Sequence, residues 1–273
     1  MLNAVSSLKG FDIQAKDGSL GTVSDFLFDD STWKVRWMVV DTGRWLTGRK
    51  VLVHPSAVIS AEYGARKLNV ALTKAQVQDS PDILQDRPVS QQMQNDLYGY
   101  YGWDPLWGGG MYGGSMFGEE MGAIASPLSS PAYFGNAALR EAERGGSDLD
   151  EGDPHLRSIS EVTGYHVHAT DGDIGHVENF LVDSESWGVR YLIVNTSNWW
   201  VGQHVLMSPH AVKDVDWSDR HIRLDVTKAK VKSSPSWNPA NVIEGDFETR
   251  LHGHYGWPGH AGDEAARSPA LAV

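Results

Sequence analysis

The 273-residue chain contains no cysteine and no long apolar segment. The absence of cysteine excludes disulfides, thiolate zinc sites and thiol nucleophiles. No window approaches the 18 consecutive apolar residues that a spanning helix needs. Met1–Gly10 lacks the cationic start and apolar run of a secretory signal. We therefore expect a soluble, cytoplasmic protein without a membrane span.

The chain also lacks an excess of basic residues. It has 23 Lys and Arg against 35 Asp and Glu, a net charge of −12. The first 97 residues are balanced at 11 of each sign, so all the excess acid follows them. A protein without a basic cluster gains little from counterion release on phosphate backbones. Nucleic acid and anionic membrane surfaces are therefore unlikely partners on electrostatic grounds.

No catalytic motif is present. The chain has no G-x-S-x-G, S-x-x-K or H-E-x-x-H sequence. Residues 108–113 match G-x-G-x-x-G formally, but that fingerprint follows a strand and opens a helix. Here it lies in a stretch rich in glycine and aromatic residues. We expect neither enzyme activity nor a bound cofactor.

What the sequence does contain is a tandem repeat. Trp33–Thr42 returns 154 positions later as Trp187–Thr196, and the match continues without a gap over residues 10–103 and 164–257. Shared composition cannot produce an ungapped match of this extent, so one module occurs twice.

The repeated strand is apolar on both faces. Val35, Trp37 and Val39 alternate with Arg36, Met38 and Val40 along residues 33–42, and side chains in a strand alternate between its faces. A strand of this kind must be covered on two sides, as in a closed sheet or under a helix. The pattern favours the central strand of a small β-barrel.

Each copy accordingly predicts an all-β barrel with short accessory helices. In the first copy we expect strands at 10–16, 20–28, 33–42, 51–53, 57–63 and 67–72, a helical turn at 73–77 and a short helix at 90–97. Gly18 belongs to an Asp-Gly turn, and Gly21 marks a bulge or a close backbone approach. Gly172 and Gly175 take the same structural roles in the second copy.

The composition changes between the copies. Glycine pairs, Ser-Pro pairs and a run of acidic residues mark 104–157 as a long, flexible linker. The expected division is a first barrel with its aromatic end at 1–103, the linker at 104–157, a second barrel at 158–257 and a disordered tail at 258–273.

One arginine per copy interrupts the apolar strand. Arg36 and Arg190 occupy matching positions. Either the arginine stem packs while its head reaches water, or the head pairs with a turn carboxylate, Asp29 or Asp183, and fixes the strand register. Both readings give the arginines a structural role.

Aromatic residues are the candidates for partner binding. Tryptophan anchors many interfaces, although a core role is equally compatible with these positions. A Tyr-Gly-Trp motif also ends each copy at a constant distance from its barrel, which favours docking on that barrel. The residues in question are Trp45, Trp199, Trp200, Tyr101, Trp103, Tyr255 and Trp257.

Two His-x-His pairs raise the question of a metal site. His166 and His168, and His252 and His254, would each lie on one side of an extended segment. Neither pair has an obvious third ligand, and the first copy holds Asp, Gln, Tyr and Tyr at the matching positions. We therefore expect solvated or hydrogen-bonded histidines and no metal.

The order of elements resembles the PRC-barrel family, which includes the cytoplasmic domain of the photosynthetic reaction-centre H subunit. The resemblance rests on residues 10–15, 17–23, 33–41, 51–58 and 73–81 with their copies, about two thirds of the chain. The Tyr-Gly-Trp ends are similar to those of bacterial proteins with two such barrels. The resemblance implies a protein-interaction or assembly module and supplies no catalytic motif.

We thus expect a non-enzymatic binding or assembly protein with an unidentified protein partner, and packing between the barrels or a homo-oligomer is compatible with it. Two alternatives are a photosynthesis-linked assembly factor and a stress protein that binds a small ligand or metal.

Overall fold

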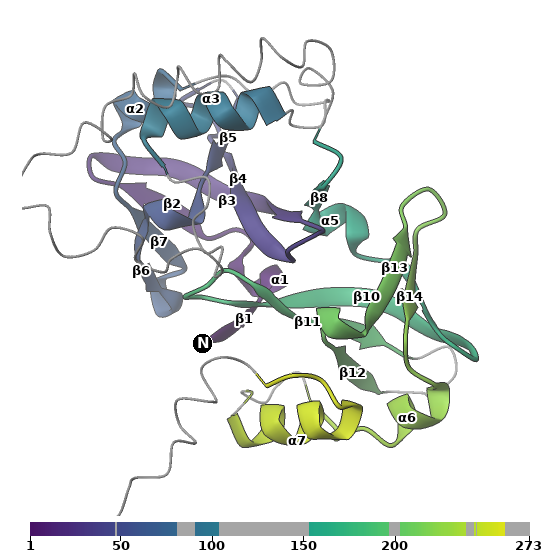
Figure 1. Cartoon of the computed structure of the whole chain (residues 1–273). Helices are drawn as coiled ribbons and strands as arrows, with labels where there is room; N and C mark the ends of the chain where they lie inside the picture. The colour runs from purple at the N-terminus through teal and green to yellow at the C-terminus, as the bar shows by residue number, and fades with distance from the viewer. Residues whose placement is uncertain are drawn as a thin grey trace, which may run out of the picture. The chain divides into compact units, whose positions relative to one another are not determined.

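The computed structural model describes residues 1–46, 48–80, 91–103, 153–196, 203–238, 243 and 245–259. The chain divides into two compact units: one is Leu8–Ser158, and the other combines Met1–Ser7 with Ile159–Val273. We call them the first and the second barrel. Each contains a seven-stranded sheet, which confirms the predicted all-β fold with two barrels in tandem. Figure 1 labels most of these strands.

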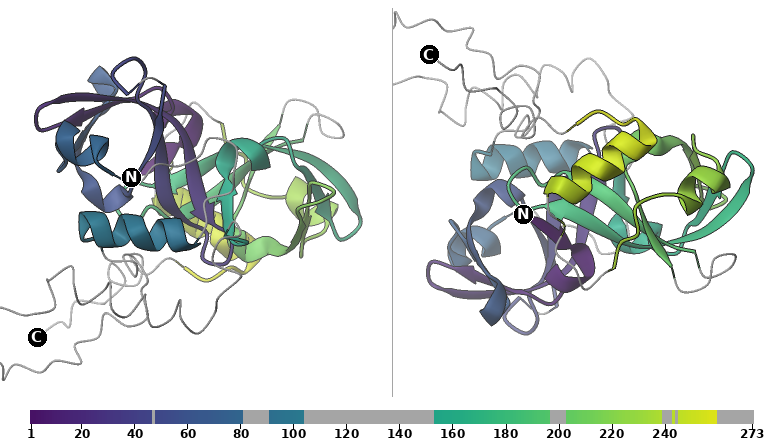
Figure 2. Two further views of the ribbon diagram at one scale, coloured as in Figure 1. Left: turned by 90° about the horizontal axis from the view of Figure 1, so that it is seen from above. Right: turned by 90° about the horizontal axis from the view of Figure 1, so that it is seen from below.

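The first barrel has a strand near each of the six positions predicted from the sequence. Its sheet runs β5-β4-β3-β2-β7-β6, antiparallel except between β2 and β7. Figure 2 shows these strands end-on as a ring, with α3 along one side. The elements are β2 (Asp12–Ala15), β3 (Gly18–Asp29), β4 (Lys34–Asp41), β5 (Lys50–Val53), η1 (Pro55–Ala57), β6 (Val58–Glu62), η2 (Tyr63–Ala65), β7 (Lys67–Val70), α2 (Lys74–Gln78) and α3 (Gln91–Tyr101).

The second barrel repeats this topology. Its sheet runs β12-β11-β10-β9-β14-β13, with β9 and β14 as the parallel pair. The elements are α5 (Ile159–Val162), β9 (His166–Ala169), β10 (Gly172–Asp183), β11 (Val189–Asn195), β12 (His204–Met207), η4 (Pro209–Ala211), β13 (Val212–Asp216), β14 (His221–Leu224), α6 (Lys228–Lys232) and α7 (Gly245–Tyr255).

The seventh strand of each sheet comes from the segment that precedes the other barrel. β1 (Leu2–Ala4) pairs antiparallel with β10 of the second barrel, and short helix α1 (Val5–Leu8) then leads into the first. β8 (Leu156–Ser158) pairs in the same way with β3 of the first barrel. β1 and β8 are themselves 154 residues apart, so the repeat includes the exchanged strands.

This exchange changes the division of the chain. The sequence suggests boundaries at 103 and 158, whereas residues 1–7 belong to the second unit and β8 belongs to the first. Most of the expected linker, residues 104–152, and residues 260–273 of the expected tail lie outside the described residues.

Strand β4 is buried on both faces, as its sequence predicts. Trp37, Met38 and Val40 are fully buried, and Val35 is nearly so. The side of Arg36 was predicted wrongly. Leu27 pairs with Trp37 and Phe28 with Val35, so Arg36 is the extra residue of a β-bulge. Its side chain therefore reaches α3 together with Trp37 instead of sharing a face with Met38.

The close approach expected at Gly21 is confirmed. Its φ is +137°, a backbone conformation that residues with a Cβ rarely adopt, and an added Cβ would overlap the carbonyl oxygen of Asp41. Gly175 meets Asn195 in the same way, with φ of +136°. Gly18 and Gly172 also have positive φ, at +137° and +135°.

The helices after each barrel are longer than expected. α3 extends through Tyr101 instead of ending at residue 97, and α7 includes Tyr255. His252 and His254 therefore lie on a helix, where residues two apart face different directions. The expectation that they share one side of an extended segment was wrong.

Candidate functional site

A layer of aromatic and aliphatic side chains joins α3 to the outer face of the first barrel. Trp37 and Val39 of β4 and Leu52 of β5 pack against Leu97 and Tyr98 of α3. The hydrophobic effect favours this contact because Trp37, Leu52 and Leu97 are almost completely removed from water. The layer fixes the helix to the barrel.

The Tyr-Gly-Trp end of the first copy completes this layer. The rings of Tyr101 and Trp103 stack with centroids 4.0 Å apart, and both pack against the cluster around Trp37. Tyr255 and Trp257 stack alike at 4.1 Å. Docking of the first motif on its own barrel is confirmed. A role of these four residues in partner binding stays a prediction.

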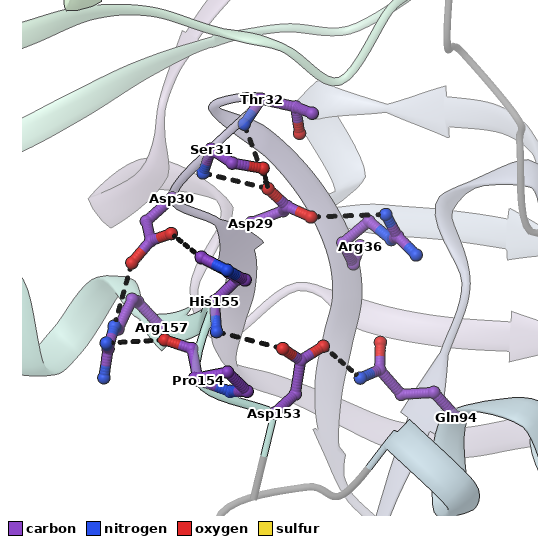
Figure 3. Close-up of polar contacts among 10 residues, drawn as sticks. All are labelled: Asp29, Asp30, Ser31, Thr32, Arg36, Gln94, Asp153, Pro154, His155 and Arg157. Atoms are coloured by element: carbon purple, nitrogen blue, oxygen red, sulfur yellow. Dashed lines mark hydrogen bonds and ion pairs between the residues drawn. The ribbon is translucent and has the colours of Figure 1, made fainter. Parts of the chain in front are cut away.

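Polar side chains cross the layer in an ordered chain. The indole Nε1 of Trp37 donates to Oε1 of Gln94 at 3.1 Å. Nε2 of Gln94 in turn donates to Oδ2 of Asp153 at 2.7 Å (Figure 3). Asp153 also accepts from the backbone N–H of His155 at 2.9 Å, just before β8. The helix, the central strand and the exchanged strand are thus linked.

Arg36 forms one of the ion pairs predicted from the sequence. Its Nη1 lies 3.4 Å from Oδ2 of Asp29 (Figure 3). Its Nε donates to the Tyr98 hydroxyl at 3.2 Å. Burial opposes ionisation of Asp29, but hydrogen bonds from Ser31 and Thr32 and the charge of Arg36 hold its pKa below the usual value. The pair ties the bulge to the turn after β3 and to α3.

His54 is a buried histidine at the end of β5. Its ring lies 5.4 Å from that of Trp37 and 5.6 Å from that of Trp103. Burial and then the charge of Arg36 lower its pKa to about 4, so the ring is neutral near pH 7. Its Nδ1 accepts from the backbone N–H of Ser56 and caps η1. This contact gives His54 a structural role.

The second barrel has a charged version of the same link. Glu248 stands where the first copy has Gln94, and His252 where it has Tyr98. Arg190 Nη2 lies 3.1 Å from Oε1 of Glu248, so it does not use the turn carboxylate Asp183 that the sequence suggested. The Tyr191 hydroxyl donates to Glu248 at 2.9 Å and lies 2.8 Å from Nε2 of His252.

His252 joins α7 to β11 and to the segment after the helix. Its Nδ1 lies 2.6 Å from the carbonyl oxygen of Pro258, which can only accept. Its Nε2 lies 2.8 Å from the hydroxyl of Tyr191, which donates to Glu248. The side chain therefore works as a bridge from α7 to β11.

With the fold and these contacts established, comparison with known families is informative. The family model for the PRC-barrel domain matches residues 2–77. The first barrel is a PRC-barrel domain. The match starts at β1, so the family's sequence unit includes the strand that here joins the other sheet. A search of curated proteins found no match to the chain.

The second barrel repeats the first in structure and in sequence. It has the strand order, parallel pair and bulged strand of the first, and its residues follow at a constant offset of 154. None of the helices in the described ranges is long and apolar enough to cross a membrane.

Trp45 packs on its own PRC barrel. Its Nε1 donates to the carbonyl oxygen of Leu20 at 2.6 Å, and Nζ of Lys74 lies 4.7 Å from the ring centroid. These contacts explain the tryptophan through the fold, while its predicted part in partner binding is untested. Trp199 and Trp200, the matching candidates of the second copy, lie outside the described residues.

Sequence reasoning missed an apolar patch at the edge of the first barrel. Ile59 on β6 is 66% exposed and Tyr63 on η2 is 40% exposed. β6 ends the strand order of its sheet. The matching position to Ile59 in the second copy is Lys213 on β13. A comparison of the two copies at edge positions could have revealed this difference.

Proposed function

We propose that this protein is a non-enzymatic interaction or assembly module that binds a protein partner at β6 and η2 of its first barrel. The observation that carries the proposal is the exposure of two apolar residues, Ile59 on the edge strand β6 and Tyr63 on η2, which follows it. Exposed apolar side chains next to unpaired backbone groups favour the addition of a partner strand.

The contrast with the second barrel supports this location. Its edge strand β13 carries Lys213, Asp214 and Asp216. Charged side chains protect an edge strand from pairing with other chains. At the matching positions the first barrel has Ile59, Ser60 and Glu62. The first edge is therefore the less protected of the two.

The titratable groups of the barrel-helix layer support a non-enzymatic role. Asp29 is held by Arg36 and turn N–H groups, and His54 is a neutral cap. Catalytic groups have perturbed pKa values that serve a reaction, whereas these shifts accompany contacts that hold the fold. The photosynthesis-linked and small-ligand alternatives remain predictions of the sequence.

The experiment compares partner capture by full-length variants. Ile59→Lys places at the edge the residue that the second copy carries there, so the barrel should keep its melting temperature. Partners are then captured from the native host and identified by mass spectrometry. The unaltered protein should retain its partners, and Ile59→Lys should lose them. Lys213→Glu is the matched control and should retain them. Capture of the same partners at the same yield by Ile59→Lys would refute this binding surface.

A further inference from the structure

The parallel strand pair of the second barrel brings three histidines together. β9 and β14 pair in register, with His166 opposite His221. His166 and His168 are two apart on β9 and point to the same face. The ring of His221 lies 5.3 Å from that of His166 and 4.8 Å from that of His168, centroid to centroid. The third imidazole that the His166–His168 pair lacks in the sequence is therefore supplied by β14.

We propose that His166, His168 and His221 bind a divalent transition-metal ion, with zinc as the reference ion. Zinc accepts imidazole nitrogens at about 2.0–2.1 Å in a tetrahedral arrangement. Two rings bound to one such ion have centres on the order of 5 Å apart, from these bond lengths and the tetrahedral angle. Both measured spacings to His221 have this size.

The three rings can turn to share an ion. Within the described ranges no three metal-binding side chains yet converge on one point, so binding requires rotation of the imidazoles. His166 is exposed, and the other two rings are partly exposed. In this part of the chain no hydrogen bond or ion pair occupies their ring nitrogens, and their recorded contacts are with each other. Rotation therefore breaks no existing polar contact.

The surrounding charges permit a cation. Arg223 lies opposite His168 on β14, but its guanidinium pairs with Asp214 at 3.1 Å and with Asp216 at 3.8 Å. Asp216 on β13 is also the strand partner of His221. On the other side of β9, His176 of β10 is the strand partner of His166. The charged side chains beside the three histidines are therefore neutral to acidic in sum.

Ligand chemistry selects the class of ion. Imidazole suits zinc, copper and nickel, whereas calcium and magnesium prefer oxygen. Three protein ligands leave a fourth position of a tetrahedral ion for water or for a group from another molecule. The barrel itself does not require the histidines, because the first copy has Asp12, Gln14 and Lys67 at the three matching positions.

The test measures zinc binding to the full-length protein after treatment with a chelator. Isothermal titration with zinc should show a site that His168→Asn and His221→Asn each weaken by about 10-fold or more. His155→Asn, which changes an exposed histidine of the other barrel, is the matched control and should leave the affinity unchanged. Cobalt should give the visible absorption of a tetrahedral site. Absence of zinc binding, or equal binding by all three variants, would overturn the proposal.

A transfer experiment keeps the proposal testable if a loss variant unfolds. β2 and β7 of the first barrel pair in parallel with the same register, Asp12 opposite Lys67. Asp12→His, Gln14→His and Lys67→His together should add a second zinc site to the folded protein. A folded triple variant that binds no additional zinc would show that this strand geometry is insufficient. These outcomes are independent of partner binding at β6.

Discussion

Removal of residues 2–7 should destabilise the second barrel and leave the first barrel intact. The reason is the exchanged strand, since β1 pairs with β10 although it precedes the first barrel in sequence. The Met1 carbonyl also accepts from the Ser184 N–H at 2.9 Å, and Ser6 exchanges hydrogen bonds with the Asn179 side chain. A division of the chain by sequence order alone predicts the opposite location for the effect.

The magnitude follows from what the segment buries. Val5 is 1% exposed, and full burial of a valine contributes roughly 1.5–3 kcal/mol. Each hydrogen bond adds roughly 0.5–1.5 kcal/mol net, and the exposed ones at Ser6 add less. A loss of about 3 kcal/mol is a large share of a total stability of roughly 5–15 kcal/mol. It corresponds to about a 100-fold rise in the population of the open second barrel.

Hydrogen exchange read by mass spectrometry locates the change. Peptides from β10 and β11 of the shortened protein should exchange about 100-fold faster, and peptides from β3 and β4 should not change. Leu156→Ala is the reciprocal control, because Leu156 of β8 packs against the hydrophobic cluster of the first barrel. It should accelerate exchange in the first barrel and leave β10 and β11 unchanged. Faster exchange in the first barrel after loss of residues 2–7 would refute the exchanged topology.

Further predictions concern a glycine and a buried histidine. Gly21→Ala should lower the free energy of unfolding by at least about 3 kcal/mol, because the new Cβ overlaps the Asp41 carbonyl and φ is +137°. Chemical denaturation measures this loss. It should be much smaller for the control Gly43→Ala, whose Cβ meets nothing within 4 Å. The pKa of His54 is lowered to about 4 from an ordinary 6.5, so the unfolded chain binds the extra proton between these values. The free energy of unfolding should therefore fall by about 3 kcal/mol as the pH drops from 6.5 to 4. The variant His54→Ser introduces the residue that the second copy has at position 208, and its thermal unfolding should depend less on pH. An unchanged dependence of its stability on pH would contradict the lowered pKa of His54.

Periodicity and repetition were sufficient to predict the barrel. The alternation around Trp37 requires two covered faces, and both are buried. Gly21 was predictable because a glycine inside a strand pattern has few explanations other than a bulge or a close approach. These features depend on residues that are near one another in the sequence, where steric rules and side-chain alternation operate directly.

Features set by distant pairing were not predictable. The bulge at Arg36 appears only when the registers of β3 and β4 are compared. β1 and β8 are three residues long, too short for an alternation pattern to identify. His221 lies 53 positions after His168, and only the parallel pairing of β9 and β14 places them together. Local patterns hold no information about which strands become neighbours.

The two copies separate what the barrel requires from what it tolerates. Trp37 with Gln94 and Tyr191 with Glu248 make the same strand-to-helix bond with different side chains, one neutral and one charged. Conservation of the bond across a change of residues indicates that docking of the helix is needed for the fold. At Ile59 the copies instead differ in chemical character, because the second copy has a lysine there. Positions of this second kind are not required by the barrel, and for that reason we place partner binding at the edge of the first barrel and metal binding on the histidine face of the second.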